Sequence, residues 1–325
     1  MSHPVAAPLD PARRRKHKLL NLLQSVVLLG GMAGLLALCA WPLVGFGGLL
    51  WILAGAALGL ALSPRVSPRL LLAMYRARPL TPANFPEGFA VLRELSRRAE
   101  LARVPRFYYI PSSLLNAFYV GQGEAASIAV TDGLLRTLEP REVVAVLAHE
   151  LSHIRNNDLW IMTLADTISR LTVFMSYAGI FLLVFGLPIM LLQGEPVPWL
   201  LILLLILAPT LITLLQLALS RAREYDADLD AAGLTGDPLG LASALEKLEF
   251  FQGRLWERIL LPGRRLPDPS LLRSHPPTAE RVKRLLELRV PGPGEGLRHG
   301  GPLDLPGHLV RVQRPPRMHL PGTWF

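Results

Sequence analysis

The chain carries the run AHELSHI at residues 148–154, which contains the spacing HExxH. Apolar residues recur around it at helical intervals, so His149 and His153 are predicted to project from one helix face, one turn apart. Two imidazoles at that spacing can bind one zinc ion, and Glu150 beside them could take a proton from a zinc-bound water. The alternative is a pair of helical histidines that hydrogen-bond to neighbouring carboxylates. The spacing predicts a hydrolytic metal centre.

A third metal ligand is expected on another helix, because catalytic zinc usually has three protein ligands and an open position. The run SRAREYDAD at residues 220–228 is the strongest candidate. Glu224 and Asp228 lie four residues apart, so both can face the HExxH helix. Glu224 would complete the ligand set, and Asp228 would accept a hydrogen bond from the free ring nitrogen of a ligand histidine. The alternative is a solvated charged turn where a helix leaves the membrane.

The composition is that of a membrane protein with a modest polar domain. Of the 325 residues, 51% are hydrophobic and 18% are charged, and the mean hydropathy is +0.35. The net charge is +9, but the basic residues flank apolar segments, so no nucleic-acid partner is predicted. Cys39 is the single cysteine, which excludes an intrachain disulfide.

Two uncharged segments near the N-terminus, Leu19–Ala40 and Leu43–Leu62, are each long enough to cross a bilayer. They follow a basic lead, residues 1–18, and only Trp41-Pro42 separates them. A tight reversal at that dipeptide predicts a transmembrane hairpin over residues 19–62. A buried core helix is the alternative for the second and weaker segment.

Two further uncharged segments, Leu171–Leu192 and Trp199–Leu219, predict a second hairpin over residues 171–219. The links of both hairpins lack Lys and Arg, whereas their other ends are basic. The positive-inside rule therefore places both termini and the HExxH segment in the cytoplasm. The expected location is the cell (inner) membrane, which the chain would cross four times.

The polar parts of the chain, residues 63–170 and 220–288, are predicted to form one catalytic domain that the second hairpin interrupts. Helices are expected at Phe85–Ala102, 221–232, 238–251 and 278–288, and short strands at Arg106–Ile110, Ala117–Val120 and Ala126–Thr131. The tail, residues 289–325, is rich in Pro and Arg and predicts no regular structure. The predicted fold class is an α+β membrane protein.

The lengths of the predicted helices constrain the chain after His153. If residues 199–224 form one straight helix, Glu224 lies roughly 38 Å along it from the outer surface. If the HExxH helix ran straight to the end of the third span, His153 would lie roughly 59 Å from that surface, too far to share one zinc ion with Glu224. We therefore predict that the helix ends or bends at residues 156–158, where Asp158 would cap a new helix.

Three motifs of the chain together resemble those of a known family. HELSH, SRAREYDAD after a membrane hairpin, and SHPP followed by Glu280-Arg281 together look like the HtpX-type membrane metallopeptidases, relatives of the CAAX prenyl endopeptidases. The resemblance covers about residues 13–288. It implies a gluzincin-like, mainly helical zinc peptidase domain with a small β-sheet and one zinc ion per chain. The implied roles are zinc ligand for His149, His153 and Glu224, general base for Glu150, and a partner behind the metal for Asp228.

The resemblance also implies residues that contact the substrate. Asn116, Ala117 and Phe118 look like the family's substrate-binding edge strand, and an extended peptide can add to such a strand through main-chain hydrogen bonds. His275 should help to stabilise the oxyanion of the tetrahedral intermediate, with Arg281 supporting it. The alternatives are an ordinary asparagine before a strand and a solvent-exposed turn histidine.

The implied activity is endoproteolysis of membrane or misfolded proteins, as in quality control and stress response, with the lipid bilayer as the second partner. A processing peptidase for one lipidated or terminal motif is an alternative that the sequence leaves open. A membrane scaffold with structural zinc is a further alternative. Structural zinc sites usually fill four positions with Cys or His, and no cysteine lies near the motif. The sequence indicates no oligomeric state.

Overall fold

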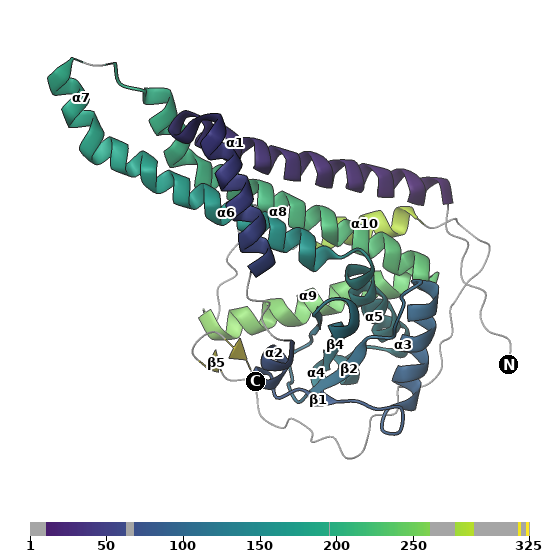
Figure 1. The fold of residues 1–325 in the computed structure, drawn as a ribbon. Helices are drawn as coiled ribbons and strands as arrows, with labels where there is room; N and C mark the ends of the chain where they lie inside the picture. The colour runs from purple at the N-terminus through teal and green to yellow at the C-terminus, as the bar shows by residue number, and fades with distance from the viewer. Residues whose placement is uncertain are drawn as a thin grey trace.

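The computed structural model describes residues 11–62, 68–194, 196–260 and 277–288, with the short pairs 318–319 and 323–324. A polar domain surrounds a four-stranded sheet, and long apolar helices extend away from it (Figure 1). The helices are α1 (Pro11–Leu62), α2 (Pro68–Met74), α3 (Pro86–Arg98), α4 (Asp132–Thr137), α5 (Pro140–Arg155), α6 (Asp158–Phe181), α7 (Leu187–Gln193), α8 (Trp199–Thr235), α9 (Pro238–Leu260) and α10 (Thr278–Glu287). The strands are β1 (Arg78–Pro79), β2 (Arg106–Ile110), β3 (Ala117–Val120), β4 (Ser127–Thr131), β5 (Met318–His319) and β6 (Thr323–Trp324).

The sheet has the strand order β1-β2-β4-β3, with β2 parallel to β4 and the outer strands antiparallel. The predicted strands β2 and β3 are confirmed, and β4 begins one residue later than predicted. All five residues of the inner strand β4 are buried, which explains why its middle residues, Ile128, Ala129 and Val130, are apolar without alternation. Strand β3 lies at the edge, where its backbone can pair with a further strand.

The core of the polar domain lies between the sheet, α3 and α5. Phe85 and Phe107 stack with ring centroids 5.9 Å apart. Tyr109 is fully buried at 0% exposure, and its hydroxyl donates a 2.9 Å hydrogen bond to Asp132. Leu147 and Leu151 of α5 belong to the same cluster. Each such buried apolar side chain contributes about 1.5–3 kcal/mol, so this core holds α5 against the sheet.

Helix α5 begins with a capping box. The Glu139 side chain accepts from the backbone of Glu142, and the Glu142 carboxylate accepts from the Glu139 N–H at 2.7 Å. Ser243 and Lys247 of α9 also donate to Glu142, at 2.5 and 2.8 Å. Burial raises the pKa of the Glu142 carboxyl, but these hydrogen bonds outweigh burial and hold the pKa below its usual value. The start of α5 is thereby joined to α9.

The predicted break after the HExxH helix is confirmed. Helix α5 ends at Arg155 and α6 begins at Asp158, with Asn157 in the left-handed region at φ 54°. The predicted capping role of Asp158 is wrong, because Asn157 is the N-cap residue and makes no side-chain cap hydrogen bond. The Asp158 carboxylate instead binds His153 and Arg223. Asn tolerates positive φ, so the dipeptide before Asp158 can reverse the chain direction.

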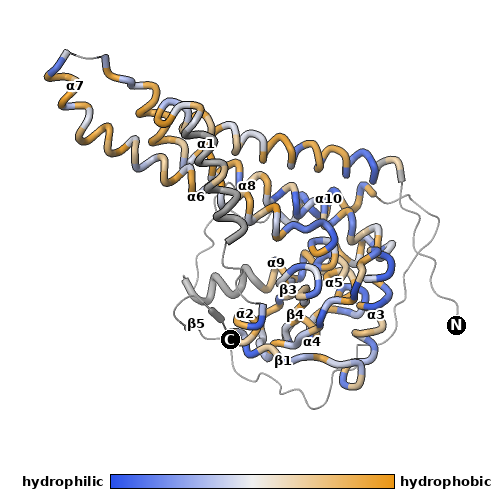
Figure 2. Tube along the Cα trace, in the orientation of Figure 1, coloured by the Kyte–Doolittle hydropathy of each residue, from blue (hydrophilic) through white to orange (hydrophobic). Residues whose placement is uncertain are grey.

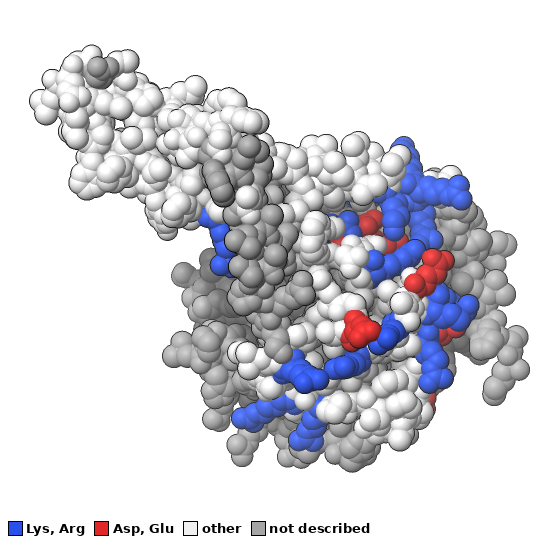
Figure 3. Space-filling view, viewed as in Figure 1, with Lys and Arg blue, Asp and Glu red and all other residues white. Residues whose placement is uncertain are grey.

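Three described helical runs are long and apolar enough to cross a membrane: Arg14–Gly47, Asp158–Gln193 and Trp199–Thr235. Figure 2 shows the mainly apolar colouring of the arm that they form outside the polar domain. Figure 3 shows that charged side chains gather on the polar domain and are nearly absent from the visible face of the arm. In an apolar stretch of 18 residues within each run, only 22%, 11% and 22% of the residues are buried within the protein, as expected of lipid-facing helices.

The predicted reversal at Trp41-Pro42 is wrong. Helix α1 continues through this dipeptide, and its break lies at Gly45, where φ is 64° and ψ is −169°. An interior proline removes one hydrogen bond, whereas only glycine adopts this backbone conformation readily. Beyond Gly47 the chain is helical to Leu62, and the crossing of this segment stays a prediction.

The chain reverses between α7 and α8 and returns along α6 (Figure 1). A π-helical turn, η2 (Leu182–Gly186), joins α6 to α7 just before Pro188. Proline cannot donate a backbone hydrogen bond, and a π-helical turn is one of the local irregularities that such a break in the helical ladder produces. Helix α8 runs through Pro209 as one helix to Thr235 and ends at Gly236 in the left-handed conformation, φ 70°. It runs from the apolar arm into the polar domain.

No regular structure was predicted for the tail after residue 289, but the described residues of the tail include one pair of short strands. Strands β5 and β6 form an antiparallel pair of two residues each. His275 lies outside the described residues, so its predicted role stays a prediction.

Candidate metal centre

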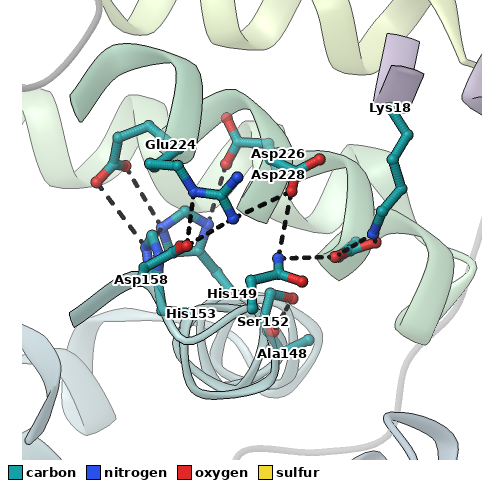
Figure 4. Close-up of polar contacts among 12 residues, drawn as sticks. Lys18, Ala148, His149, Ser152, His153, Asp158, Glu224, Asp226 and Asp228 are labelled. Carbon is teal, nitrogen blue, oxygen red and sulfur yellow. Dashed lines mark hydrogen bonds and ion pairs between the residues drawn. The ribbon is translucent and has the colours of Figure 1, made fainter. Parts of the chain in front are cut away.

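Helices α5 and α8 bring His149, His153 and Glu224 together in a buried group, named the metal centre below. Ligand atoms of the three side chains lie within 4.8 Å of one another. The two Nε2 atoms are 3.2 Å apart. The Glu224 carboxylate lies 3.5 Å from Nε2 of His149 and 3.9 Å from Nε2 of His153 (Figure 4).

The residues present fit a zinc ion. Tetrahedral coordination with bonds of about 2.0–2.1 Å requires ligand atoms about 3.3 Å apart, and two of the three separations are within a few tenths of that value. The Nδ1 atoms of both histidines face carboxylates, so neutral imidazoles that carry their protons on Nδ1 would direct both Nε2 lone pairs toward each other. Lone pairs that converge in this way suit a cation between them. Two histidines, one glutamate and an open position form the donor set of catalytic zinc sites.

His149 is held from the polar domain. Its Nδ1 lies 3.1 Å from Asp228, with an alignment too poor for a full hydrogen bond. Arg281 of α10 donates two hydrogen bonds to Asp228, at 2.7 and 2.6 Å, and lies 3.3 Å from Glu224. Burial lowers the pKa of His149, but Asp228 and Glu224 outweigh it and raise that pKa to about 10. The centre therefore favours positive charge.

His153 is held by residues that the sequence analysis did not assign to the site. Its Nδ1 lies 2.6 Å from Asp158, and Arg223 donates to the other oxygen of Asp158 at 2.6 Å. Tyr119 of β3 stacks on the His153 ring, with centroids 5.3 Å apart and planes at 17°. A rule that each ligand histidine needs a partner for its second nitrogen would have pointed to Asp158, five residues downstream. No local pattern indicated Arg223 or Tyr119.

Glu150 lies beside the metal centre and is 9% exposed. Burial raises the pKa of its carboxyl above the usual value, although the nearby histidines and a hydrogen bond with the Tyr119 backbone oppose that shift. A carboxylate with a raised pKa is a stronger proton acceptor. The position suits a general base.

The predicted substrate strand lies next to the metal centre. Residues alternate across β3, so Tyr119 faces His153 while Phe118 packs on Tyr75 of the opposite face, with ring centroids 5.3 Å apart. Ala117 packs against the core, and Asn116 is exposed just before the strand. The edge position of β3 is compatible with strand addition by a peptide, which stays a prediction.

Arg281 was expected to support His275. Its guanidinium binds Asp228 and approaches Glu224, so it stabilises the orientation of two carboxylates at the metal centre. These contacts raise the pKa of Arg281, against the opposing effect of burial, and keep the side chain charged. Its expected support of His275 stays a prediction.

Comparisons with known proteins point to one family. The sequence profile of peptidase family M48 matches residues 82–289. A protease HtpX homolog of Acaryochloris marina is 38% identical over 284 residues, which cover 83% of this chain and 95% of that protein. A protease HtpX homolog of Kineococcus radiotolerans is 37% identical over 298 residues, covering 84% and 98% of the two proteins.

A solved structure shares the fold. The crystal structure of Ste24p from S. mikatae matches with a TM-score of 0.50 at 20% identity. The match covers 83% of this chain and 66% of that longer chain. The likeness shows that this fold occurs in a second protein.

Proposed function

This chain belongs to peptidase family M48 and is a membrane metallopeptidase of the HtpX type, and we propose that it is a zinc endopeptidase that cleaves membrane or misfolded proteins at the cytoplasmic face. One observation carries the proposal. His149, His153 and Glu224 converge at catalytic-zinc spacing, and Glu150 is buried beside them. A structural zinc site would not need that carboxylate.

In the proposed mechanism the three ligands hold one zinc ion per chain. Zinc would supply Lewis acidity, which polarises a peptide carbonyl and lowers the pKa of water. Glu150 would accept the proton of the attacking water and pass it to the leaving amine. His275 would donate a hydrogen bond to the oxyanion that develops on the peptide. Asp228 and Asp158 would hold the Nδ1 protons, so that both Nε2 atoms stay available as ligands.

The substrate would bind as an extended segment along the outer edge of β3. Main-chain hydrogen bonds from Ala117 would hold it without demanding a particular sequence, because the backbone of Asn116 already bonds Thr131 of β4 and backbone groups alternate between the two edges of a strand. The hydrogen bond between the Tyr119 backbone and Glu150 supports this placement, because the same strand then aligns both the peptide and the general base. Such recognition suits unfolded chains, which expose their backbone.

The proposed topology has four spans in two hairpins, with both termini and the metal centre in the cytoplasm. Basic residues at the polar-domain ends of the apolar helices support it. Lys18, at the basic end of α1, binds Asp230 near the metal centre, so this end of the first span lies on the catalytic side. A cysteine replacing Val197, in the link between α7 and α8, should react with an impermeant thiol reagent in intact cells. A reaction only after lysis would contradict the topology.

The decisive experiment compares the wild type with Glu150→Gln after purification in detergent. Both proteins should contain about one zinc ion per chain, because the substitution leaves the ligands in place. Casein cleavage by the variant should fall by at least about 100-fold, since the general base is lost. Wild type stripped of metal by a chelator is the control and should be inactive. Cleavage by Glu150→Gln at the wild-type rate would exclude Glu150 as the base.

A further inference from the structure

Lys18 lies at the basic end of the first membrane helix, 212 residues away in sequence from its partner Asp230. Its amino group donates to both carboxylate oxygens of Asp230, each at 2.8 Å. Asp230 is 0% exposed, and an unpaired carboxylate so deeply buried is strongly unfavourable. Arg14, one turn earlier, places its guanidinium 3.5 Å from Asp230 and directly against the α8 backbone at Gly233. The basic end of α1 is therefore docked on α8.

A chain of polar contacts continues from Asp230 toward the metal centre. Asn156, in the turn between α5 and α6, donates to Asp230 at 2.9 Å and more weakly to Asp226 at 3.4 Å. Asp226 lies 3.2 Å from Arg223, and Arg223 binds Asp158.

Asp158 completes the chain, since it lies 2.6 Å from Nδ1 of His153. Figure 4 shows these contacts between α8 and the end of α5. The charged members between Lys18 and His153 are at most 6% exposed, so water screens them little.

We propose that Lys18 is a positioning residue for the metal centre: by docking α1 on Asp230 it holds the chain Asp230–Asn156–Asp226–Arg223–Asp158 that orients His153. Each side chain in the chain of contacts restricts the orientation of the next, because a buried charged group has few alternative hydrogen-bond partners. Loss of Lys18 frees Asp230 to draw Asn156 away from Asp226. His153 then loses the fixed orientation that metal binding needs.

A small cavity also places α1 beside the site. Asn21, one turn after Lys18, is 4% exposed, and its amide nitrogen has no hydrogen-bond partner among the described residues. It lines a small cavity together with Tyr225 and with Asp228, the carboxylate behind His149. The first membrane helix therefore adjoins the supports of both histidines.

This inference rests on the proposed zinc site, so its test measures metal retention in the full-length protein in detergent. Zinc release to a colorimetric chelator should be about tenfold faster for Lys18→Met than for wild type, the lower end of the effect of outer metal-site partners. Lys18→Arg should restore slow release, because it keeps a donor cation. Lys16→Met, at an exposed position on the same helix, is the matched control and should behave as wild type.

A second variant distinguishes an effect transmitted through the chain of polar contacts from an effect of attaching α1 to α8. Asn156→Leu cuts the chain beyond Asp230 and should speed zinc release to a similar extent. The double variant Lys18→Met/Asn156→Leu should release zinc no faster than either single variant, because both cut one chain. Additive effects, or wild-type release by a folded Asn156→Leu protein, would overturn the inference. If Lys18→Met fails to fold, Asn156→Leu alone decides. Wild type that binds no zinc would instead refute the proposed function.

Discussion

The two sides of the metal centre hold their histidines with similar groups, which come only partly from the same helix. On one side Asp228 of α8 faces His149, and Arg281 of α10 in the polar domain supports it. On the other side Asp158, the first residue of a membrane-spanning helix, binds His153. Each side is a histidine, a carboxylate and an arginine, and α8 supplies one residue to each, Asp228 to the first and Arg223 to the second. The remaining residue is Arg281 of the polar domain on the first side and Asp158 of the apolar helix α6 on the second.

The contacts on the two sides also differ in quality. The carboxylate lies 2.6 Å from Nδ1 of His153, but 3.1 Å and misaligned at His149. Arg281 shares its charge between Asp228 and the ligand Glu224, whereas Arg223 shares its charge between Asp158 and Asp226, which lies outside the ligand set. The His149 side is therefore joined directly to Glu224 through Arg281. The His153 side is fixed by the way the membrane helices enter the polar domain.

The largest effect is expected from removing the ligand that both sides share. Glu224→Ala should lower zinc affinity by more than the roughly 100-fold that outer partners reach, because a direct bond to the metal is lost. Bound zinc after dialysis measures it, with circular dichroism to verify folding. Normal zinc content in a folded variant would place the third ligand elsewhere and remove the basis of the comparison.

Asp228→Asn should have the next largest effect. Zinc affinity should fall roughly 10–100-fold, since the Nδ1 proton of His149 loses its charged partner. The buried Arg281 also loses its main partner, so stability should drop by about 3–5 kcal/mol in chemical unfolding. The variant Asp228→Asn/Arg281→Met is the control, because it removes the stranded charge and should recover part of that stability but not the zinc affinity.

Asp158→Asn should lower zinc affinity over the same range, roughly 10–100-fold, with a smaller loss of stability of about 1–3 kcal/mol. The loss is smaller because Arg223 keeps Asp226 at 3.2 Å, whereas the second partner of Arg281, Glu224 at 3.3 Å, would also be bound to the zinc ion. Parallel unfolding and zinc titrations of the Asp158 and Asp228 variants measure the difference. Equal stability losses would contradict the distinction drawn between the two sides.

The smallest effect on metal is expected from Glu142→Ala, at the far end of α5. It removes the capping box and the hydrogen bonds to Ser243 and Lys247, which should cost about 1–3 kcal/mol of stability. Zinc affinity of the folded protein should stay within about twofold, because neither side of the centre is touched. A drop as large as that of Asp158→Asn would mean that the whole helix, rather than its two carboxylates, sets the affinity.

Local features were predicted well from the sequence. HExxH on α5 and the spacing of Glu224 and Asp228 on α8 depend on the period of one helix. The break at residues 156–158 followed from helix rise alone, because two straight helices of different length could not meet at one metal. The reversal of α1 was misplaced because Pro42 seemed the stronger break, whereas the change of direction required a glycine with positive φ at Gly45.

What the sequence by itself determined is which residues could do the chemistry: two histidines and a glutamate that could hold a metal ion, a carboxylate beside them, the apolar spans and the edge strand. Those properties follow from residue type and from spacing within single elements, where backbone geometry leaves few choices. Only the tertiary structure decided which charges support that chemistry. Arg223 meets Asp158 across 65 residues, and Lys18 meets Asp230 across 212. A buried charged group needs a nearby partner of opposite charge. Which residue is near enough depends on how the packed helices cross in space.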